Sequence, residues 1–316
     1  MRVAAVVVWF NPCFIQGGNS PVENILSYAG HVEKVYIVDN SSADNSSLAS
    51  KIQNSVYISN KNVNGIAGAL NKGCGAAKND GFEWVLTMDQ DSCFDQEQLS
   101  GYLKACEKYS VDDKCVSFSL KHKKDNEQNS CMHWISKNIT KPIRFKVLSP
   151  IKRKLLHITN LPPAGTECKC GTEPVGCTWE IITSANLVKL DAWEKVGGYD
   201  EILFIDLVDV DFTYKLHLAG YKIFKFPWLY FHHNLGEPKK TFFSKRTPME
   251  SDFRMRYIFR NLLILKDRYP DLDCITLYLK RYIIDYCILN LKGLKYAKIY
   301  RKARNEYLDM KKAKLV

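Results

Sequence analysis

Apolar residues come in short continuous runs along the first part of the chain. Four such runs are rich in Val, Ile and aromatic residues: 2–10, 34–42, 54–62 and 83–91. Runs that are apolar on both faces are typical of parallel strands in a sheet covered by helices on both sides. Three stretches between them predict helices: 21–30, 44–53 and 66–80. This alternation predicts an α/β fold with a doubly wound beginning.

Polar residues follow the predicted strands where the strands end. Asn11, Asp39 and Asp89 occupy such positions, and ligands of open parallel sheets bind beyond the carboxyl ends of the strands. Asp91 lies two residues after Asp89, so in an extended chain both carboxylates project to one side. Neighbouring carboxylates repel one another unless they share a cation. Because Mg²⁺ and Mn²⁺ accept carboxylates beside water and phosphate oxygens, the pattern predicts a site for one of these ions. A solvated turn is the alternative.

A glycine-rich stretch, GIAGALNKGCGAAK, covers residues 65–78. It lacks the third glycine of a dinucleotide fingerprint and the Gly-Lys-Ser/Thr of a P-loop, which disfavours a dehydrogenase or a nucleoside triphosphatase. We expect Gly73 and Gly75 to serve helix packing.

The composition fits a globular protein with a sizeable core, since the 316 residues are 46% hydrophobic. The 11 cysteines are odd in number and scattered, which is typical of a reducing cytoplasm. Cys168, Cys170 and Cys177 lie close together, but they lack the four regularly spaced ligands of a zinc site. The apolar start of the chain is interpreted as a first buried strand. No uninterrupted apolar run approaches the roughly 20 residues that span a bilayer, so we expect no integral membrane protein.

Basic residues are concentrated in two segments. The formal net charge is +11; residues 280–316 hold 11 Lys and Arg against 3 Asp and Glu, and residues 121–154 hold 10 against 2. From about residue 237 the chain predicts helices, in which basic and aromatic residues alternate over 254–305. Such helices suit an anionic membrane surface, with arginines on lipid phosphates. Nucleic acid is the rival partner, but no nucleic-acid module is recognisable.

Several stretches together resemble glycosyltransferase family 2, and most of all its bacterial rhamnosyltransferase branch. They are VVVWFNP, VYIVDNSSADNS, NVNGIAGALNKG, WVLTMDQDS, FHHNLG and the long block at 182–224. The resemblance covers residues 3–236 and implies the GT-A fold, a mostly parallel sheet flanked by helices. It implies a catalytic domain at 1–236, with a nucleotide-binding half at about 1–95 and an acceptor half at about 96–236. A basic, aromatic helical region follows at 237–316.

The same resemblance implies roles for individual residues. Five residues would contact the nucleotide: Asn11, Asp39, Asn64, Gly65 and Asp89. Two residues would bind the Mn²⁺ or Mg²⁺ ion: Asp91 and His233. Four residues would line the donor sugar and the acceptor: Trp179, Ser184, Asn186 and Asp206. For Asp39 a helix cap is the alternative, and Trp179 suits a buried core equally well.

Three acids lie in the stretch LFIDLVDVDFTYKL, where a helix is predicted to begin. An acceptor hydroxyl must lose its proton as it attacks, so the reaction needs a base. Many relatives have Glu-Asp where this chain has Val208-Asp209. The resemblance therefore implies Asp209 as the catalytic base, with Asp211 in reserve. Acids in the first turn of a helix also complement its dipole. For at least one of the three acids, this structural role is the alternative to a catalytic one.

The activity implied by the resemblance is an inverting, metal-dependent sugar transfer. The sugar would move from a nucleotide diphosphate donor to a hydroxyl of a growing, lipid-diphosphate-linked cell-surface polysaccharide. The expected donor is dTDP-rhamnose, and a UDP-hexose such as UDP-glucose or UDP-galactose is the alternative. A nucleotidyltransferase and a non-catalytic nucleic-acid or phosphate-binding protein are alternatives from other classes. We expect a cytoplasmic protein that lies peripherally at the inner face of the cell membrane; a homodimer stays open.

Overall fold

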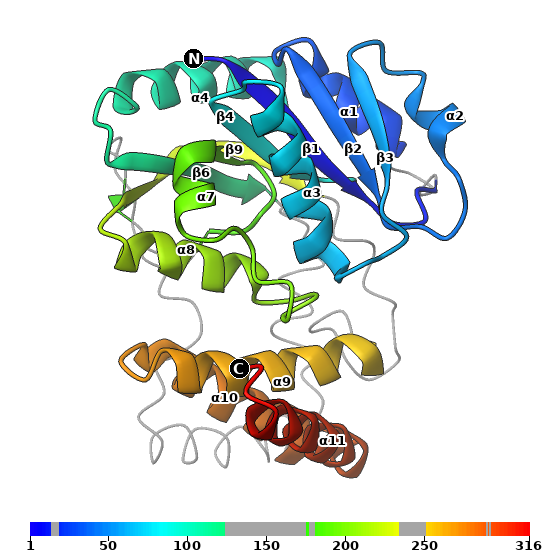
Figure 1. The fold of residues 1–316 in the computed structure, drawn as a ribbon, viewed down its shortest axis with the longest axis vertical. Helices are drawn as coiled ribbons and strands as arrows, with labels where there is room; N and C mark the ends of the chain where they lie inside the picture. The colour runs from blue at the N-terminus through cyan, green and yellow to red at the C-terminus, as the bar shows by residue number, and fades with distance from the viewer. Residues whose placement is uncertain (14–18, 124–174, 177–180, 234–250, 289, 291) are drawn as a thin grey trace, which may run out of the picture. The chain divides into compact units, whose positions relative to one another are not determined.

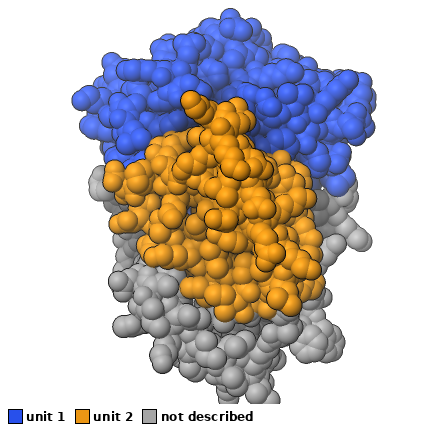
Figure 2. All heavy atoms as spheres, turned by 60° about the horizontal axis from the view of Figure 1, so that its bottom comes forward, with its two compact units in different colours: residues 1–127, 169–236 blue, residues 128–168, 237–316 orange. Residues whose placement is uncertain are grey.

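The computed structural model describes residues 1–13, 19–123, 175–176, 181–233, 251–288, 290 and 292–316. The chain divides into two compact units, which Figure 2 distinguishes by colour. Unit 1 comprises Met1–Glu127 and Lys169–Gly236, and unit 2 comprises Gln128–Cys168 and Glu237–Val316. The functional parts expected from the sequence stay a prediction.

Unit 1 is built around one mixed β-sheet (Figure 1). Its strands in the described residues are β1 (Val3–Trp9), β2 (Lys34–Asp39), β3 (Ser55–Ser59), β4 (Trp84–Asp89), β5 (Ser92–Cys93), β6 (Cys115–Lys123), β7 (Val175–Gly176), β8 (Asn186–Lys189) and β9 (Lys222–His233). They lie in the order β3-β2-β1-β4-β8-β6-β9-β5, and β7 pairs with β9. The strands β1 to β4 pair in parallel, whereas β8 runs antiparallel to both β4 and β6. The expected α/β fold is confirmed, with the parallel pairing concentrated in its first half.

The helices of unit 1 in the described residues are α1 (Pro21–Ala29), α2 (Ser46–Ala49), α3 (Gly65–Asn79), α4 (Gln96–Tyr109), α7 (Leu190–Lys195) and α8 (Val208–Leu218). The helices predicted at 21–30 and 66–80 are confirmed to within one residue at each end. The helix predicted at 44–53 is wrong in length, because α2 has four residues. The serines of this stretch form hydrogen bonds to nearby backbone groups, which compete with a longer helix. The Ser50 hydroxyl, for example, donates to the Ser47 carbonyl.

Helices cover both faces of the parallel strands, which explains their apolar runs. Trp9 of β1 lies in a core cluster with Tyr28 of α1 and Tyr102 of α4. On the other face, α3 packs over β1 at Gly73, where an added Cβ would lie 2.4 Å from Cγ1 of Val6. The expected packing role is therefore confirmed for Gly73. It is wrong for Gly75, because nothing lies within 4 Å of the Cβ position there.

Unit 2 is helical in its described part, as the sequence predicts. Its elements are α9 (Asp252–Arg268), α10 (Asp273–Tyr282), a π-helical segment (Ile283–Ile288) and α11 (Gly293–Lys312). Two ion pairs join α9 to α11: Nε of Arg256 lies 2.7 Å from Oε2 of Glu306, and Nη1 of Arg260 lies 3.0 Å from Oε1. Arg260 is 5% exposed, so it has a structural role within unit 2; membrane binding by residues 254–305 stays a prediction.

None of the described helices combines the length and the apolarity that crossing a bilayer would require.

Candidate active site

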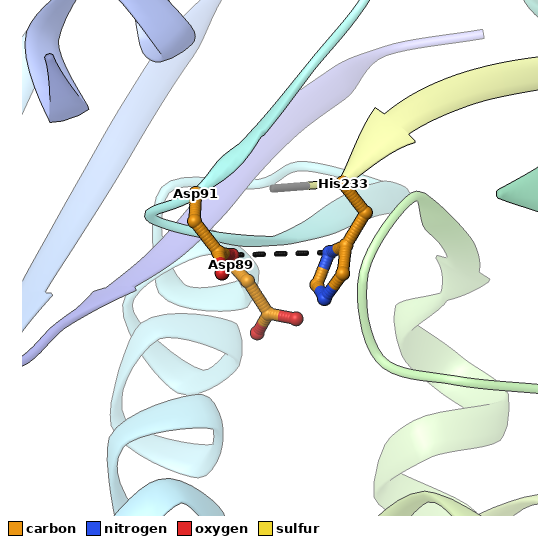
Figure 3. Close-up of side chains that lie close together, drawn as sticks. All are labelled: Asp89, Asp91 and His233. Carbon is orange, nitrogen blue, oxygen red and sulfur yellow. Dashed lines mark ion pairs between the residues drawn. The ribbon is translucent and has the colours of Figure 1, made fainter. Parts of the chain in front are cut away.

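Asp89, Asp91 and His233 converge where β4 and β9 end (Figure 3). One ligand atom from each lies within 4.8 Å of the others, and Nδ1 of His233 is 3.8 Å from Oδ1 of Asp91. The two carboxylates lie close together, but the extended backbone that was expected between them is wrong. The strand β4 ends at Asp89, and Gln90 and Asp91 form a turn. We call these three residues the Asp-Asp-His cluster.

Gln90 fixes this turn to the end of β1. Its Oε1 accepts the backbone N–H of Phe10 at 2.8 Å, and its Nε2 donates to the Phe10 carbonyl at 3.2 Å. Nδ2 of Asn24, which is 1% exposed, donates to the backbone carbonyl of Gln90 at 2.9 Å. Gln90 therefore has a structural role that the sequence did not indicate, because a single Gln belongs to no recognisable motif.

Ser184 is fully buried beside the Asp-Asp-His cluster. Its Oγ accepts the backbone N–H of Asp89 at 3.3 Å and donates to Oγ of Ser92 at 2.7 Å. The Oγ of Ser92 lies 2.6 Å from Nδ1 of His233. Substrate contact by Ser184 stays a prediction. Ser92 was not predicted, because its partner His233 lies 141 residues away in the chain.

Burial shifts two acids of this region, Asp91 and Asp209, toward their neutral forms. It raises the pKa of the Asp91 carboxyl, and the charge of His233 opposes that shift. Burial also raises the pKa of Asp209 to about 6; backbone hydrogen bonds oppose it, and the charges of Asp206 and Asp89 add to it. Acids with raised pKa values gathered in one place are favourable surroundings for a cation, and they are typical of functional sites.

The donor set of the Asp-Asp-His cluster fits a divalent ion. Two carboxylates leave the other positions of such an ion to water and phosphate oxygens. A bound cation would also relieve the cost of the partly buried Asp91 carboxylate. Mg²⁺ prefers oxygen ligands throughout, so an imidazole ligand favours Mn²⁺.

The loop that leads into α8 is fixed to α3. Oδ1 of Asn71 accepts the backbone N–H of Tyr199 at 2.8 Å, and Nδ2 donates to the Tyr199 carbonyl at 2.8 Å. Nδ2 of Asn64 donates to Glu201. Three residues of this loop have left-handed backbones: Phe204 (φ 63°), Asp206 (φ 61°) and Leu207 (φ 65°). None is glycine, and strain of this kind is concentrated at functional sites.

Gly65→Ala is expected to destabilise this loop. Gly65 has φ +62°, and an added Cβ would lie 2.3 Å from the carbonyl oxygen of Phe204, which also accepts the backbone N–H of Ile66. Strain at such a position costs about 1–3 kcal/mol. Gly75→Ala in the same helix is the matched control, expected to stabilise by about 0.5–1 kcal/mol. Thermal unfolding checks both; equal midpoints would contradict the steric role of Gly65.

The charge of Asp89 helps to raise the pKa of Asp209, one of the two candidate bases. Asp209 is partly buried, and its Oδ1 accepts the backbone N–H of Val210 at 2.9 Å. Asp211 is fully buried, and its Oδ2 lies 3.3 Å from Nζ of Lys215. Asp211 therefore takes part in a structural ion pair with Lys215. The catalytic roles of both stay predictions.

The residues predicted to contact the nucleotide lie at or just after the ends of the parallel strands. Asp39 is buried and accepts three hydrogen bonds, from Ser41 N (2.8 Å), Asn45 Nδ2 (2.7 Å) and Tyr57 Oη (2.9 Å). Part of its acceptor capacity is therefore used within the protein. Asn11 is exposed, with φ 47°, and its backbone N–H donates to Oγ of Ser41 at 2.6 Å. Nucleotide contact stays a prediction for the whole group.

Asn186 begins β8 and is 3% exposed. Its Oδ1 accepts a hydrogen bond from Oγ of Ser117 at 2.8 Å. A contact with the sugar or the acceptor stays a prediction for Asn186, as it does for Asp206. Trp179 lies outside the described residues, as do the three cysteines of the disfavoured zinc site.

Comparisons with known proteins agree with this fold. Residues 22–159 match the family model described as "Glycosyl transferase family 2". No curated protein matches the sequence.

Two solved structures share the fold at low sequence identity. S. aureus TarS 1-349 in complex with UDP-GlcNAc has 14% identity and a TM-score of 0.51, over 98% of this chain and 73% of that one. GalNAc-T7 with UDP, GalNAc and Mn²⁺ has 12% identity and a TM-score of 0.53, over 96% of this chain and 54% of that one. A longer S. aureus TarS chain has 15% identity and a TM-score of 0.48, and this chain spans 40% of it. The first two of these likenesses support the expected GT-A fold.

Proposed function

We propose that the protein transfers a sugar from a nucleoside diphosphate sugar to a hydroxyl acceptor, with inversion at the anomeric carbon. The observation that carries the proposal is the Asp-Asp-His cluster at the carboxyl ends of strands, and the match of residues 22–159 to the family 2 model supports it. Asp209, an acid of raised pKa, lies within electrostatic reach of that cluster. Metal ligands and a base are the two groups that such a transfer requires.

In this proposal the chain's own residues divide the work. Asp91 and His233 bind the divalent ion, and Asp89 contacts the ribose or water on the ion. The ion supplies charge neutralisation as negative charge grows on the leaving diphosphate. Asp209 accepts the proton of the attacking hydroxyl. A pKa of about 6 leaves Asp209 ionised at neutral pH while keeping it a useful base.

The proposed donor is dTDP-rhamnose, on the strength of the sequence pattern around LFIDLVD. A UDP-hexose is the second candidate, and it is supported by the UDP and UDP-GlcNAc complexes of the structural neighbours. The proposed acceptor is a lipid-diphosphate-linked saccharide of a cell-surface polysaccharide. Donor sugars can differ by a single hydroxyl, and contacts between that hydroxyl and the binding pocket select the donor.

A panel of nucleotide sugars tests the function. Purified protein is incubated with each donor, an acceptor saccharide and Mn²⁺ or Mg²⁺, and release of nucleoside diphosphate is measured. Release that needs both acceptor and metal supports the proposal. Release of pyrophosphate or nucleoside triphosphate would indicate a nucleotidyltransferase instead, and no release from any donor would contradict the proposal.

We also propose that unit 2 binds an anionic membrane surface through α11. Its basic residues are mostly exposed: Lys295, Lys298, Arg301, Lys302, Arg304, Lys311 and Lys312. Its acids are only Glu306 and Asp309, and Glu306 is engaged by α9. Each basic residue near such a surface contributes about 1 kcal/mol.

The double change Lys298→Glu and Arg301→Glu is therefore expected to weaken flotation with anionic liposomes strongly, because it reverses two exposed charges on one helix. Lys104→Glu, an exposed change on α4, is the control and should float like the wild type. Wild-type protein that stays at the bottom of the gradient would refute membrane attachment.

A further inference from the structure

Ser92 belongs to a buried series of hydrogen bonds that ends at His233. Ser92 and Ser184 are both fully buried, and their Oγ atoms are 2.7 Å apart. Ser92 also lies 2.6 Å from Nδ1 of His233, whose side chain is 11% exposed. The series begins at the backbone N–H of Asp89, which donates to Ser184 at 3.3 Å. One member of the Asp-Asp-His cluster is thus linked to another through two serines.

The backbone holds this series in place from several sides. Ser92 of β5 pairs directly with His233 of β9 in the antiparallel ladder. Ala185, the residue after Ser184, has a left-handed backbone with φ 57°, and its carbonyl accepts the hydroxyl of the buried Tyr102 at 3.1 Å. Both serines therefore lie on fixed backbone, so the imidazole of His233 is held by a rigid partner.

We propose that Ser92, supported by Ser184, is a positioning residue that fixes the His233 ring and leaves Nε2 as the nitrogen offered to the divalent ion. The inference rests on the metal site of the proposed function. A nitrogen already hydrogen-bonded at 2.6 Å is not open to an ion. A hydroxyl both donates and accepts, so the bond to Ser92 persists when the ring carries its proton on Nδ1. Partners of this kind typically contribute a factor of about 10–100 to metal affinity.

The test measures Mn²⁺ binding by electron paramagnetic resonance, with UDP present, in the full chain. Ser92→Ala is expected to weaken Mn²⁺ binding about 10–100-fold and to reduce the electron spin-echo modulation from the His233 nitrogen. Ser184→Ala should weaken binding less, because Ser92 keeps its own contact with the ring. Ser92→Thr, which retains a hydroxyl, should restore part of the nitrogen signal. Ser119→Ala is the matched control, a serine 2% exposed in β6 of the same sheet.

The outcomes separate this inference from the proposed function. Wild-type affinity and nitrogen modulation in Ser92→Ala would overturn the inference and leave the proposed function standing. Mn²⁺ bound by the wild type without nitrogen modulation would overturn the inference as well, since His233 would then not be a ligand. No Mn²⁺ binding by the wild type would overturn both the inference and the metal site. If Ser92→Ala fails to fold by circular dichroism, Ser184→Ala decides: Mn²⁺ affinity and nitrogen modulation equal to those of the wild type would overturn the inference.

Discussion

Asp91→Ala is expected to abolish most of the sugar transfer. The change removes a carboxylate from the Asp-Asp-His cluster, and with it a proposed ligand of the ion that would neutralise the leaving diphosphate. Stabilisation of that kind is worth several kcal/mol, so turnover should fall by about 10²–10⁴-fold. The measurement is the rate of nucleoside diphosphate release at saturating Mn²⁺, compared with the Mn²⁺ dissociation constant of the same variant.

The fold should survive this change. Burial raises the pKa of Asp91, so the ionised carboxylate costs the metal-free fold free energy at neutral pH. The thermal midpoint of metal-free Asp91→Ala should therefore equal or exceed that of the wild type. Asp113→Ala, in which a 95% exposed side chain is removed, is the control and should leave turnover unchanged. Wild-type turnover in Asp91→Ala would remove the main support for a metal-dependent transfer.

Asp209→Asn is expected to have the second large effect. Loss of a general base lowers rates by about 10²–10⁴-fold. In the wild type kcat/KM should rise with pH up to about 6 and level off above, since the base works in its ionised form. A bound divalent ion offsets the charge of Asp89, so the inflection of the loaded enzyme should lie at or below that value. The variant should show no such inflection.

Stability provides an independent check on Asp209. Its folded pKa is raised, so the stability it contributes is present at acidic pH and is lost as pH rises through about 6. Asp209→Asn should therefore raise the thermal midpoint at pH 8 and give little gain at pH 4. Asp211→Asn is the comparison, because it breaks a buried ion pair with Lys215. It should lower the midpoint while leaving turnover of the folded protein near the wild-type rate; the reverse pattern would make Asp211 the base.

Hydrophobic pattern was enough to predict the first half of the sheet. The runs that became β1, β2 and β4 are buried on both faces because α1 and α4 cover one side and α3 the other, whereas the edge strand β3 is only partly buried. The strands β6, β8 and β9 were not assigned from pattern. Strand β9 carries bulge-like shifts in its pairing with β6, and β8 has only four residues, so neither gives a long periodic signal.

The site was predictable only in part, because some of its residues give no local signal in the sequence. Asp89 and Asp91 stand out because two acids end an apolar run, and family resemblance supplied His233. Ser92 and Gln90 act through contacts with residues far away in the chain, so no local pattern marks them. The left-handed backbone at Phe204 and Leu207 is equally hidden, because the usual signal for it is glycine and neither residue is one.

The position of β4 between β1 and β8 has a consequence for synthesis of the protein. During translation β4 can pair with β1 as soon as it emerges, but its other edge has no partner until β8 is made. β4 ends at Asp89 and β8 begins at Asn186, so at about 5–20 residues per second the ribosome needs on the order of 5–20 s to supply that partner. For that interval a growing chain exposes the open edge of an apolar strand, which invites chaperone binding and, when many ribosomes are translating at once, aggregation.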